Sequence, residues 1–416
     1  MSFDWHTEDE IEWEGLAEPA ADTAVSPQHR WRVWLLAGVL LVAGTAVLFV
    51  ARQLNQRVEA ASSAVELDVQ ASHRVLQEAA QKRDGELFAT FLSGRDPEWG
   101  NAQVLLVNQG LYLERPLFGL TWLPGSTAVV SATLSLDLQA AELAVVQAYR
   151  FDIGRGLTET ARLQQTEVYR RAENRFLLSP PLAEFWGEPR QFSTVYLTLH
   201  YPARDEVWLR PLAARLEAAV AGVCAEWGAD CPANFHLSLD FSISPAAFLP
   251  EEREADGLLV LPAPSLAGRP LDETGKAVLY RGYETAVTEA ALRQLAGESD
   301  SLLYEAALDR ILAEKGLRPW PLTPSHWQTI AAAQTALADG AVVWQGQDSP
   351  QAERLAHAIV QFLVEEQGVS SRRLLAAVVR DQALPYSIWL SAVMNEVDAA
   401  EAAAWDQFVA EQAKSG

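Results

Sequence analysis

The sequence predicts an α+β protein: one transmembrane helix, a helix-plus-antiparallel-sheet domain, and a mixed strand and helix domain that becomes all-helical toward the C-terminus. A charge-free run near the N-terminus, alternating apolar segments in the middle and helical apolar spacing after about residue 278 support this prediction. The predicted regions are an acidic tail at 1–30, a transmembrane helix at 31–52, a first domain at 65–190 and a second domain at 191–412.

Composition excludes several classes of protein. A chain of 416 residues is long enough for about two or three folded units. Its net charge of −23 offers no basic face for nucleic acid, so we expect no nucleic-acid partner. The two cysteines are too few for a disulfide scaffold or a cysteine-rich metal module.

Residues 33–51 read VWLLAGVLLVAGTAVLFVA and contain no charged side chain. As a helix, this run would span about 28 Å, close to the hydrocarbon thickness of a bilayer. Trp31 and Trp34 stand at its first boundary, where indole rings favour the membrane interface. A buried core helix is the alternative, although core helices rarely run this long without a polar face. The run therefore predicts a single-pass protein that contacts the lipid bilayer through residues 33–51.

The orientation of this predicted anchor is not fixed by its flanking charges. Arg30 and Arg32 precede the run, and Arg52 and Arg57 follow it, so the positive-inside count is close to a tie. Large C-terminal domains after an uncleaved anchor are commonly translocated. We therefore expect a cell-membrane location, with a cytoplasmic N-terminus and most of the chain extracytoplasmic.

The N-terminal tail is strongly acidic. Residues 1–30 hold eight acids and one base, with Trp5, Ile11 and Trp13 spread among the acids. Acidic segments with interspersed aromatic residues are typical of disordered chains that fold onto a partner. The tail is thus a candidate site for recognition by a protein partner. A solvated tail without a partner is the alternative.

The two cysteines lie close together in the sequence. Cys224 and Cys231 are separated by AEWGAD, in which the glycine allows the chain to turn back. A short-loop disulfide between them would suit an oxidising compartment. Two reduced, buried thiols remain the alternative.

The first domain begins with a helix and continues with strands. ELDVQASHRVLQEAAQKRD carries an apolar stripe, and VSATLSLDL, ELAVVQAYRF and TARLQQTEVYRR alternate as half-buried strands do. A helix before a twisted antiparallel sheet resembles the cone-shaped fold of the nuclear-transport-factor-two-like superfamily. TEVYRRAENRFLLSPPLAEFWG is similar to the final hairpin of those domains. The resemblance implies a hollow sheet, into which His73 would point if it acted in a site; a surface or capping histidine is the reading we favour.

The second domain runs strand, helix, strand, strand and then helices. This order resembles gluzincin-type, peptidase MA-like domains. ERLAHAIVQFLVEEQGVSSRRLLAAVV is similar to their helix pair after the active site. AAEAAAWDQFVAEQ is similar to their closing helix, with Trp405 as the packed aromatic residue.

The metal motif of that group is degenerate here. Zinc peptidases need His-Glu-x-x-His on a helix, because the i, i+4 spacing brings both imidazoles to one face. The resemblance places Tyr283 and Val287 at the two histidine positions, Glu284 at the general base and Glu305 near the third ligand. Valine has no lone pair, so we predict a non-catalytic copy of the fold without metal or cofactor.

The two glutamates then have a simpler interpretation, as surface residues or partners of arginines such as Arg281 and Arg310. The chain also lacks the GxSxG, GxxxxGK[ST] and GxGxxG motifs. We therefore predict a membrane-anchored, non-catalytic interaction or sensing protein with extracytoplasmic domains. The alternative is a membrane-anchored hydrolase with a non-zinc site, or a small-molecule site in the cone-like domain.

Overall fold

The structure is a computed structural model. Its chain forms two compact units, residues 1–63 and residues 64–416. Its backbone description covers residues 27–154, 157–173, 175–252, 254–255, 257–338, 350–380 and 399–414. Side chains are not described at 27–37, 39, 43, 47, 254–255, 333–338, 380 and 399–402. The predicted recognition residues Trp5, Ile11 and Trp13 lie outside the described residues.

The first helix, α1 (Pro27–Lys82), is 56 residues long. Among the described residues, no helix is long and apolar enough to cross a membrane, and this contradicts the predicted transmembrane helix. The charge-free run is one part of a longer helix that goes on through Arg52, Arg57 and Glu59. Several side chains of the run itself, including those of 33–37, lie outside the description.

Within the unit 64–416, the last turns of α1 bury one face. Val65, Val69, Leu76 and Ala80 are buried at spacings of one or two helical turns. We predicted Leu67 as part of the apolar stripe of this helix, and this is wrong, because Leu67 is 67% exposed. Two helices follow α1, namely α2 (Gly85–Ala89) and α3 (Pro97–Gln109).

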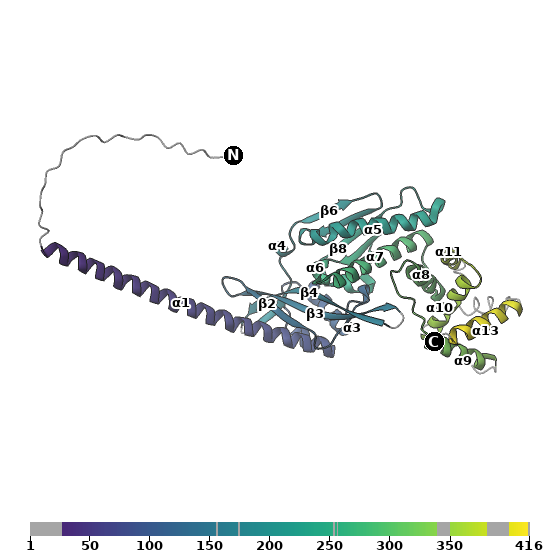
Figure 1. The fold of residues 1–416 in the computed structure, drawn as a ribbon, viewed down its shortest axis with the longest axis horizontal. Coiled ribbons are helices and arrows are strands. Elements are labelled where there is room, and N and C mark those ends of the chain that lie inside the picture. The colour runs from purple at the N-terminus through teal and green to yellow at the C-terminus, as the bar shows by residue number, and fades with distance from the viewer. Residues whose placement is uncertain are drawn as a thin grey trace, which may run out of the picture. The chain divides into compact units, whose positions relative to one another are not determined.

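The first sheet is an antiparallel sheet built around one long hairpin. Its strands are β1 (Thr121–Trp122), β2 (Ala128–Leu134), β3 (Ala140–Gly154), β4 (Leu157–Ala172), β5 (Arg175–Ser179) and β11 (Arg269–Pro270). β3 pairs with β4 along its length, and β2 pairs with the free edge of β3 (Figure 1). β1 pairs with the same edge of β3, and β5 and β11 pair with the free edge of β4. Odd-numbered side chains of β3 from Ala141 to Phe151 are buried, which confirms the predicted alternation.

The second sheet has the order β6-β7-β8-β10-β9. Its strands are β6 (Pro189–Ser193), β7 (Leu197–Pro202), β8 (Leu237–Ser242), β9 (Glu254–Ala255) and β10 (Leu258–Pro262). β7, β8 and β10 are parallel, and α5 (Glu206–Trp227) makes the crossover from β7 to β8. Leu209, Leu212, Leu216 and Val220 lie on one face of α5 and are buried.

The helix α7 (Glu273–Ala296) ties the two sheets together. It packs against α5 and also against β4, β10 and β11 (Figure 1). Tyr283 stacks edge-on against Phe118, which precedes the first sheet, and against Phe241 of β8. Residues on both sides of the predicted boundary near 190 therefore share one core, while the boundary itself stays a prediction.

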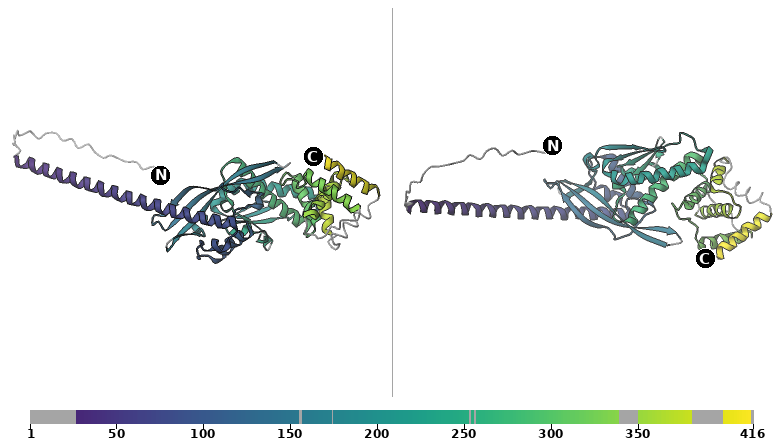
Figure 2. Two further views of the ribbon diagram at one scale, coloured as in Figure 1. Left: turned by 90° about the horizontal axis from the view of Figure 1, so that it is seen from below. Right: turned by 45° about the horizontal axis from the view of Figure 1, so that its top comes forward.

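The C-terminal part is helical, as predicted. It contains α8 (Leu302–Glu314), α9 (Pro324–Ala338), α10 (Pro350–Glu365), α11 (Ser371–Arg380) and α13 (Ala399–Lys414). Figure 2 shows these helices gathered at one end of the unit 64–416. Trp405 of α13 is buried and packs against Phe362 of α10, which fits its predicted role as a packed aromatic residue.

Short elements complete the fold. They are the helices α4 (Ala183–Trp186) and α6 (Pro264–Ala267) and the 3-10 turns η1 (Pro116–Phe118), η2 (Ala203–Asp205), η3 (Gly228–Asp230), η4 (Pro245–Phe248) and η5 (Pro250–Glu252). Three of them, α4, η4 and α6, meet α3 and β4 at the cavity described next. The described part of the chain is thus a mixed α+β fold with a curled antiparallel sheet and many helices.

Candidate functional site

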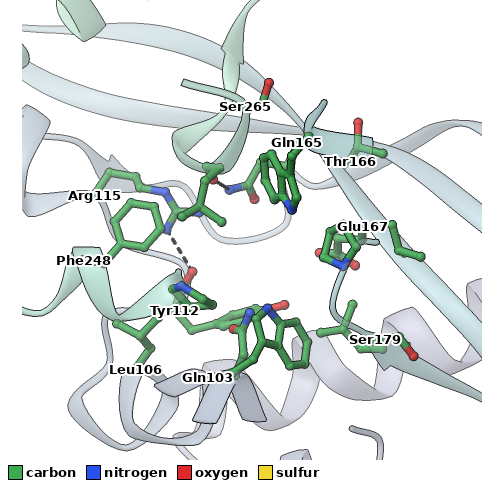
Figure 3. A pocket seen from close by; sticks show the side chains of 17 residues that line it. Gln103, Leu106, Tyr112, Arg115, Gln165, Thr166, Glu167, Ser179, Phe248 and Ser265 are labelled. Atoms are coloured by element: carbon green, nitrogen blue, oxygen red, sulfur yellow. Dashed lines mark hydrogen bonds between the residues drawn. The ribbon is translucent and has the colours of Figure 1, made fainter. Parts of the chain in front are cut away.

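A cavity of about 80 Å³ lies beside the first sheet. One wall comes from α3, and the others come from β4, the end of β5, α4, η4 and α6 (Figure 3). Aromatic rings of Trp99, Tyr112, Trp186 and Phe248 line it, together with polar side chains. A partly open, largely apolar space with a few polar groups has the lining of a small-molecule site, but this one is smaller than the roughly 300–1,000 Å³ of most ligand pockets.

The α3 wall follows from the local sequence. Asp96 caps the helix by accepting a hydrogen bond from the Trp99 backbone, and Gly110 ends it with a φ of 76°. Trp99, Gln103 and Leu106 recur at spacings of four and three residues, so they share one helix face. That face is the one that lines the cavity.

The opposite wall holds a buried carboxylate, Glu167 of β4. Its Oε2 accepts hydrogen bonds from His73 Nδ1 at 2.8 Å and from the Tyr169 hydroxyl at 2.6 Å. The side chains of His73 and Glu167 are 5% and 12% exposed. His73 therefore points inward from α1, and the surface or capping position that we favoured from the sequence is wrong.

The ionisation of this pair follows from two opposing effects. Burial alone would lower the pKa of His73, but the charge and hydrogen bond of Glu167 outweigh it and raise that pKa. Burial alone would raise the pKa of Glu167, but His73, Tyr169 and Arg115 together lower it. Glu167 is therefore a carboxylate at neutral pH, and its Oε1 accepts no hydrogen bond within the described residues.

A buried cation lines the same cavity. Arg115 is 3% exposed, and its guanidinium lies 4.5 Å from the centre of the Phe248 ring. Its Nε donates to the carbonyl of Ala267 at 3.2 Å, and its Nη1 donates to the carbonyls of Tyr112 and Glu114. In the described part of the chain, Nη2 donates no hydrogen bond and no carboxylate forms an ion pair with Arg115.

Two neutral groups join these charges at the cavity. The Gln103 side-chain amide and the Tyr112 hydroxyl line the cavity without a hydrogen-bond partner among the described residues. Burial, followed by the charge of Glu167, raises the pKa of Tyr112 well above its ordinary value, so its hydroxyl keeps its proton. The cavity thus combines free donors and acceptors with aromatic walls.

The residues at the degenerate metal motif do not form a site. Tyr283 and Val287 are fully buried in the core of the unit 64–416, and the Tyr283 hydroxyl donates to the carbonyl of Pro262 at 2.6 Å. Within the described residues, no group of three or more His, Cys, Asp or Glu side chains is arranged to hold a metal ion. Tyr283 and Val287 therefore serve packing.

The two glutamates of that motif form ion pairs at the surface of their helices. Glu284 lies 2.6 Å from Arg215 of α5, and Glu305 lies 3.0 Å from Arg293 of α7. The expected type of partner, an arginine, is present for both. Their partners differ from the predicted Arg281 and Arg310, because side chains on facing helices are closer than sequence neighbours.

The cysteines are paired. Cys224, at the end of α5, and Cys231 form a disulfide with a Cα–Cα distance of 5.2 Å. Gly228 turns the chain between them with a φ of 60°. The bond lies outside the cavity lining and closes a short loop before β8.

Comparisons with known proteins give no relative: no family model, no curated protein and no solved structure matches the chain. The predicted resemblances to the cone-shaped superfamily and to a degenerate gluzincin domain are therefore not supported, and we withdraw both. They rested on the order of helices and strands and on packing patterns, which many unrelated folds share. The site has to be argued from its own geometry.

The sequence did not reveal the cavity residues Arg115, Tyr112 and Glu167. Arg115 lies in the loop sequence YLERPLFG, where an arginine is normally exposed. Glu167 did carry a signal, since it occupies an odd-numbered position between Gln165 and Tyr169 on the buried face of β4. A charged residue on a buried strand face points to a partner or a ligand.

Proposed function

We propose that this protein is a non-catalytic binding protein that senses a small polar molecule held in the cavity between α3 and β4. The observation that carries the proposal is Arg115, a guanidinium that is 3% exposed and lacks an ion-pair partner among the described residues. Burying a charge without a counter-charge is costly, and the carbonyl hydrogen bonds of Arg115 offset only part of that cost. A ligand with a complementary group would offset that cost.

The free polar groups support the same proposal. Glu167 Oε1, Arg115 Nη2, the Gln103 amide and the Tyr112 hydroxyl all belong to cavity-lining residues and are unused in the described structure. None of these four groups is sealed from solvent, so each is open to a hydrogen bond from a molecule in the cavity. Their gathering around one space supports a polar occupant.

A hydrolase, the alternative prediction, has less support. A general acid needs a raised carboxyl pKa, whereas the pKa of Glu167 is lowered. His73 does not line the cavity, and its Nε2 is buried without a partner among the described residues. His73 is thus placed to orient Glu167 and has no contact with the space where a substrate would sit.

The proposal is tested by thermal unfolding of the full chain in the presence of a panel of small polar compounds at millimolar concentration. We expect at least one compound to raise Tm, because a ligand that binds the folded state stabilises it by mass action. The Glu167→Gln variant should lose this shift. Glu159→Gln, the same change at an exposed position of the same strand, should keep it. If no compound raises Tm of the unmodified chain, the proposed function is wrong.

A further inference from the structure

We infer that the ligand is a small zwitterion of amino-acid size, whose cationic group contacts Glu167 and whose anionic group contacts Arg115. This inference rests on the proposed function and names the chemical class that the site would take. Figure 3 shows Arg115 at one side of the cavity and Glu167 at the other.

The Glu167 end is suited to an ammonium group. Its Oε2 is fixed by His73 and Tyr169, which leaves Oε1 as the carboxylate oxygen free to accept. The aromatic residues Trp99 and Tyr112 line the same space. Aromatic faces attract cations, so the rings and the carboxylate favour the same kind of group.

The Arg115 end is suited to a carboxylate. Two of its nitrogens are held by backbone carbonyls of Tyr112, Glu114 and Ala267, so the guanidinium is fixed in position before a ligand arrives. Its Nη2 makes no hydrogen bond within the described residues and remains free to donate. A charged N–H donor held in a fixed position is suited to a carboxylate oxygen.

The pairing of opposite charges discriminates between ligand classes. A simple cation would leave Arg115 without a counter-charge and would be repelled by it. A simple anion would offer no donor to Glu167 Oε1, although His73 already pairs with the other oxygen of that carboxylate. A zwitterion offers an acceptor to Arg115 Nη2 and a donor to Glu167 Oε1, so it matches both ends of the cavity.

The cavity volume sets the size of that molecule. About 10–15 Å³ of such volume is needed for one water molecule. The 80 Å³ of the cavity is several times that threshold, so the cavity has room for a small molecule. Glycine, alanine and serine are the smallest zwitterions of this class.

The test is isothermal titration of the full chain with three matched sets of probes. Glycine and alanine carry both charges, propionate and ethylammonium carry one each, and propionamide carries none. We expect binding of at least one zwitterion and at least ten-fold weaker binding of the other probes, since a charged hydrogen bond is worth about ten- to hundred-fold in affinity.

Substitutions of Glu167 and of Arg115 test the contribution of each end of the cavity to binding. Glu167→Gln should weaken zwitterion binding by roughly 10- to 100-fold and reduce the discrimination against propionate. Arg115→Lys keeps the charge but loses the carbonyl hydrogen bonds that fix the donor in position, and should weaken zwitterion binding as well. Arg150→Lys on β3 and Glu159→Gln on β4 are exposed controls and should bind as the unmodified chain does.

The outcomes also separate this inference from the proposed function. If propionate, ethylammonium or propionamide binds at least as tightly as the zwitterions, the inference is wrong and the proposed function stands. If the zwitterions bind equally well to Glu167→Gln, the assignment of the cationic end is wrong. If neither these probes nor the wider panel binds, both proposals fail together.

Discussion

The imidazole of His73 lies 2.8 Å from the carboxylate of Glu167, although the two residues are 94 positions apart in the sequence. The contact joins the last turns of α1 to the inner face of β4. It also holds Glu167 Oε2, so that the remaining oxygen is available at the cavity. The pair is therefore expected to matter both for stability and for the shape of the site.

Loss of the imidazole should destabilise the unit 64–416. In His73→Leu, Glu167 keeps Tyr169 as a partner but loses its buried counter-charge, so we expect the free energy of unfolding to fall by about 3 kcal/mol. Urea unfolding of the full chain measures this. His200→Leu changes an exposed histidine of β7 and should shift stability by about 0.5 kcal/mol or less. Equal effects of the two variants would contradict a buried ion pair at His73.

The same pair predicts a pH optimum of stability. Because the pKa of His73 is raised in the folded state, its contribution is complete below its ordinary value of 6.5 and is lost as pH rises through the raised pKa. Because the pKa of Glu167 is lowered, its contribution is complete above its ordinary value of 4.5 and is lost as pH falls through the lowered pKa.

The stability difference between the unmodified chain and His73→Leu should therefore be largest between about pH 4.5 and 6.5 and shrink on both sides. Chemical unfolding at a series of pH values measures this difference. A difference that does not change with pH would mean that the two groups are not coupled in the folded protein.

The contact of α7 with the first sheet region depends on a glycine. A Cβ at Gly282 would lie 2.3 Å from the Phe118 ring and 2.9 Å from the Phe118 backbone. Gly282→Ala should therefore reduce stability by about 1–3 kcal/mol through overpacking. Gly222→Ala on α5 meets nothing within 4 Å and should increase stability by about 0.5–1 kcal/mol. Thermal unfolding of both variants tests these two predictions. A Gly282→Ala protein as stable as the unmodified chain would contradict the close packing of α7 against Phe118.

The disulfide should contribute modestly to stability. Cys224 and Cys231 are separated by 7 positions, and closing so short a loop is worth about 2.5 kcal/mol by chain entropy. The double variant Cys224→Ala, Cys231→Ala should lose about this amount in a denaturant titration and should become insensitive to reductant. If reductant leaves the stability of the unmodified chain unchanged, the bond is absent or contributes nothing.

Local patterns explain which parts of the fold could be predicted. The alternation on β3 depends on neighbouring residues, and the structure confirms it. The charge-free run near the N-terminus was also a local signal. The transmembrane helix that it predicted is contradicted, because no helix among the described residues is long and apolar enough to cross a membrane.

The candidate site could not be predicted in the same way. Its lining comes from α3, the segment with Tyr112 and Arg115, β4 and the segment 245–266, and no short motif links them. β11 reaches β4 from more than 100 positions away, which places Leu266 and Ala267 beside Gln165 and Arg115. Such contacts depend on long-range packing, which periodicity does not encode.

The most direct test of the account is a high-resolution crystal structure of the full chain purified from its native source without added ligand. The account predicts density for a small organic molecule that contacts both Arg115 Nη2 and Glu167 Oε1. Ordered water alone, or a collapsed cavity in which Arg115 and Glu167 form a direct ion pair, would contradict it.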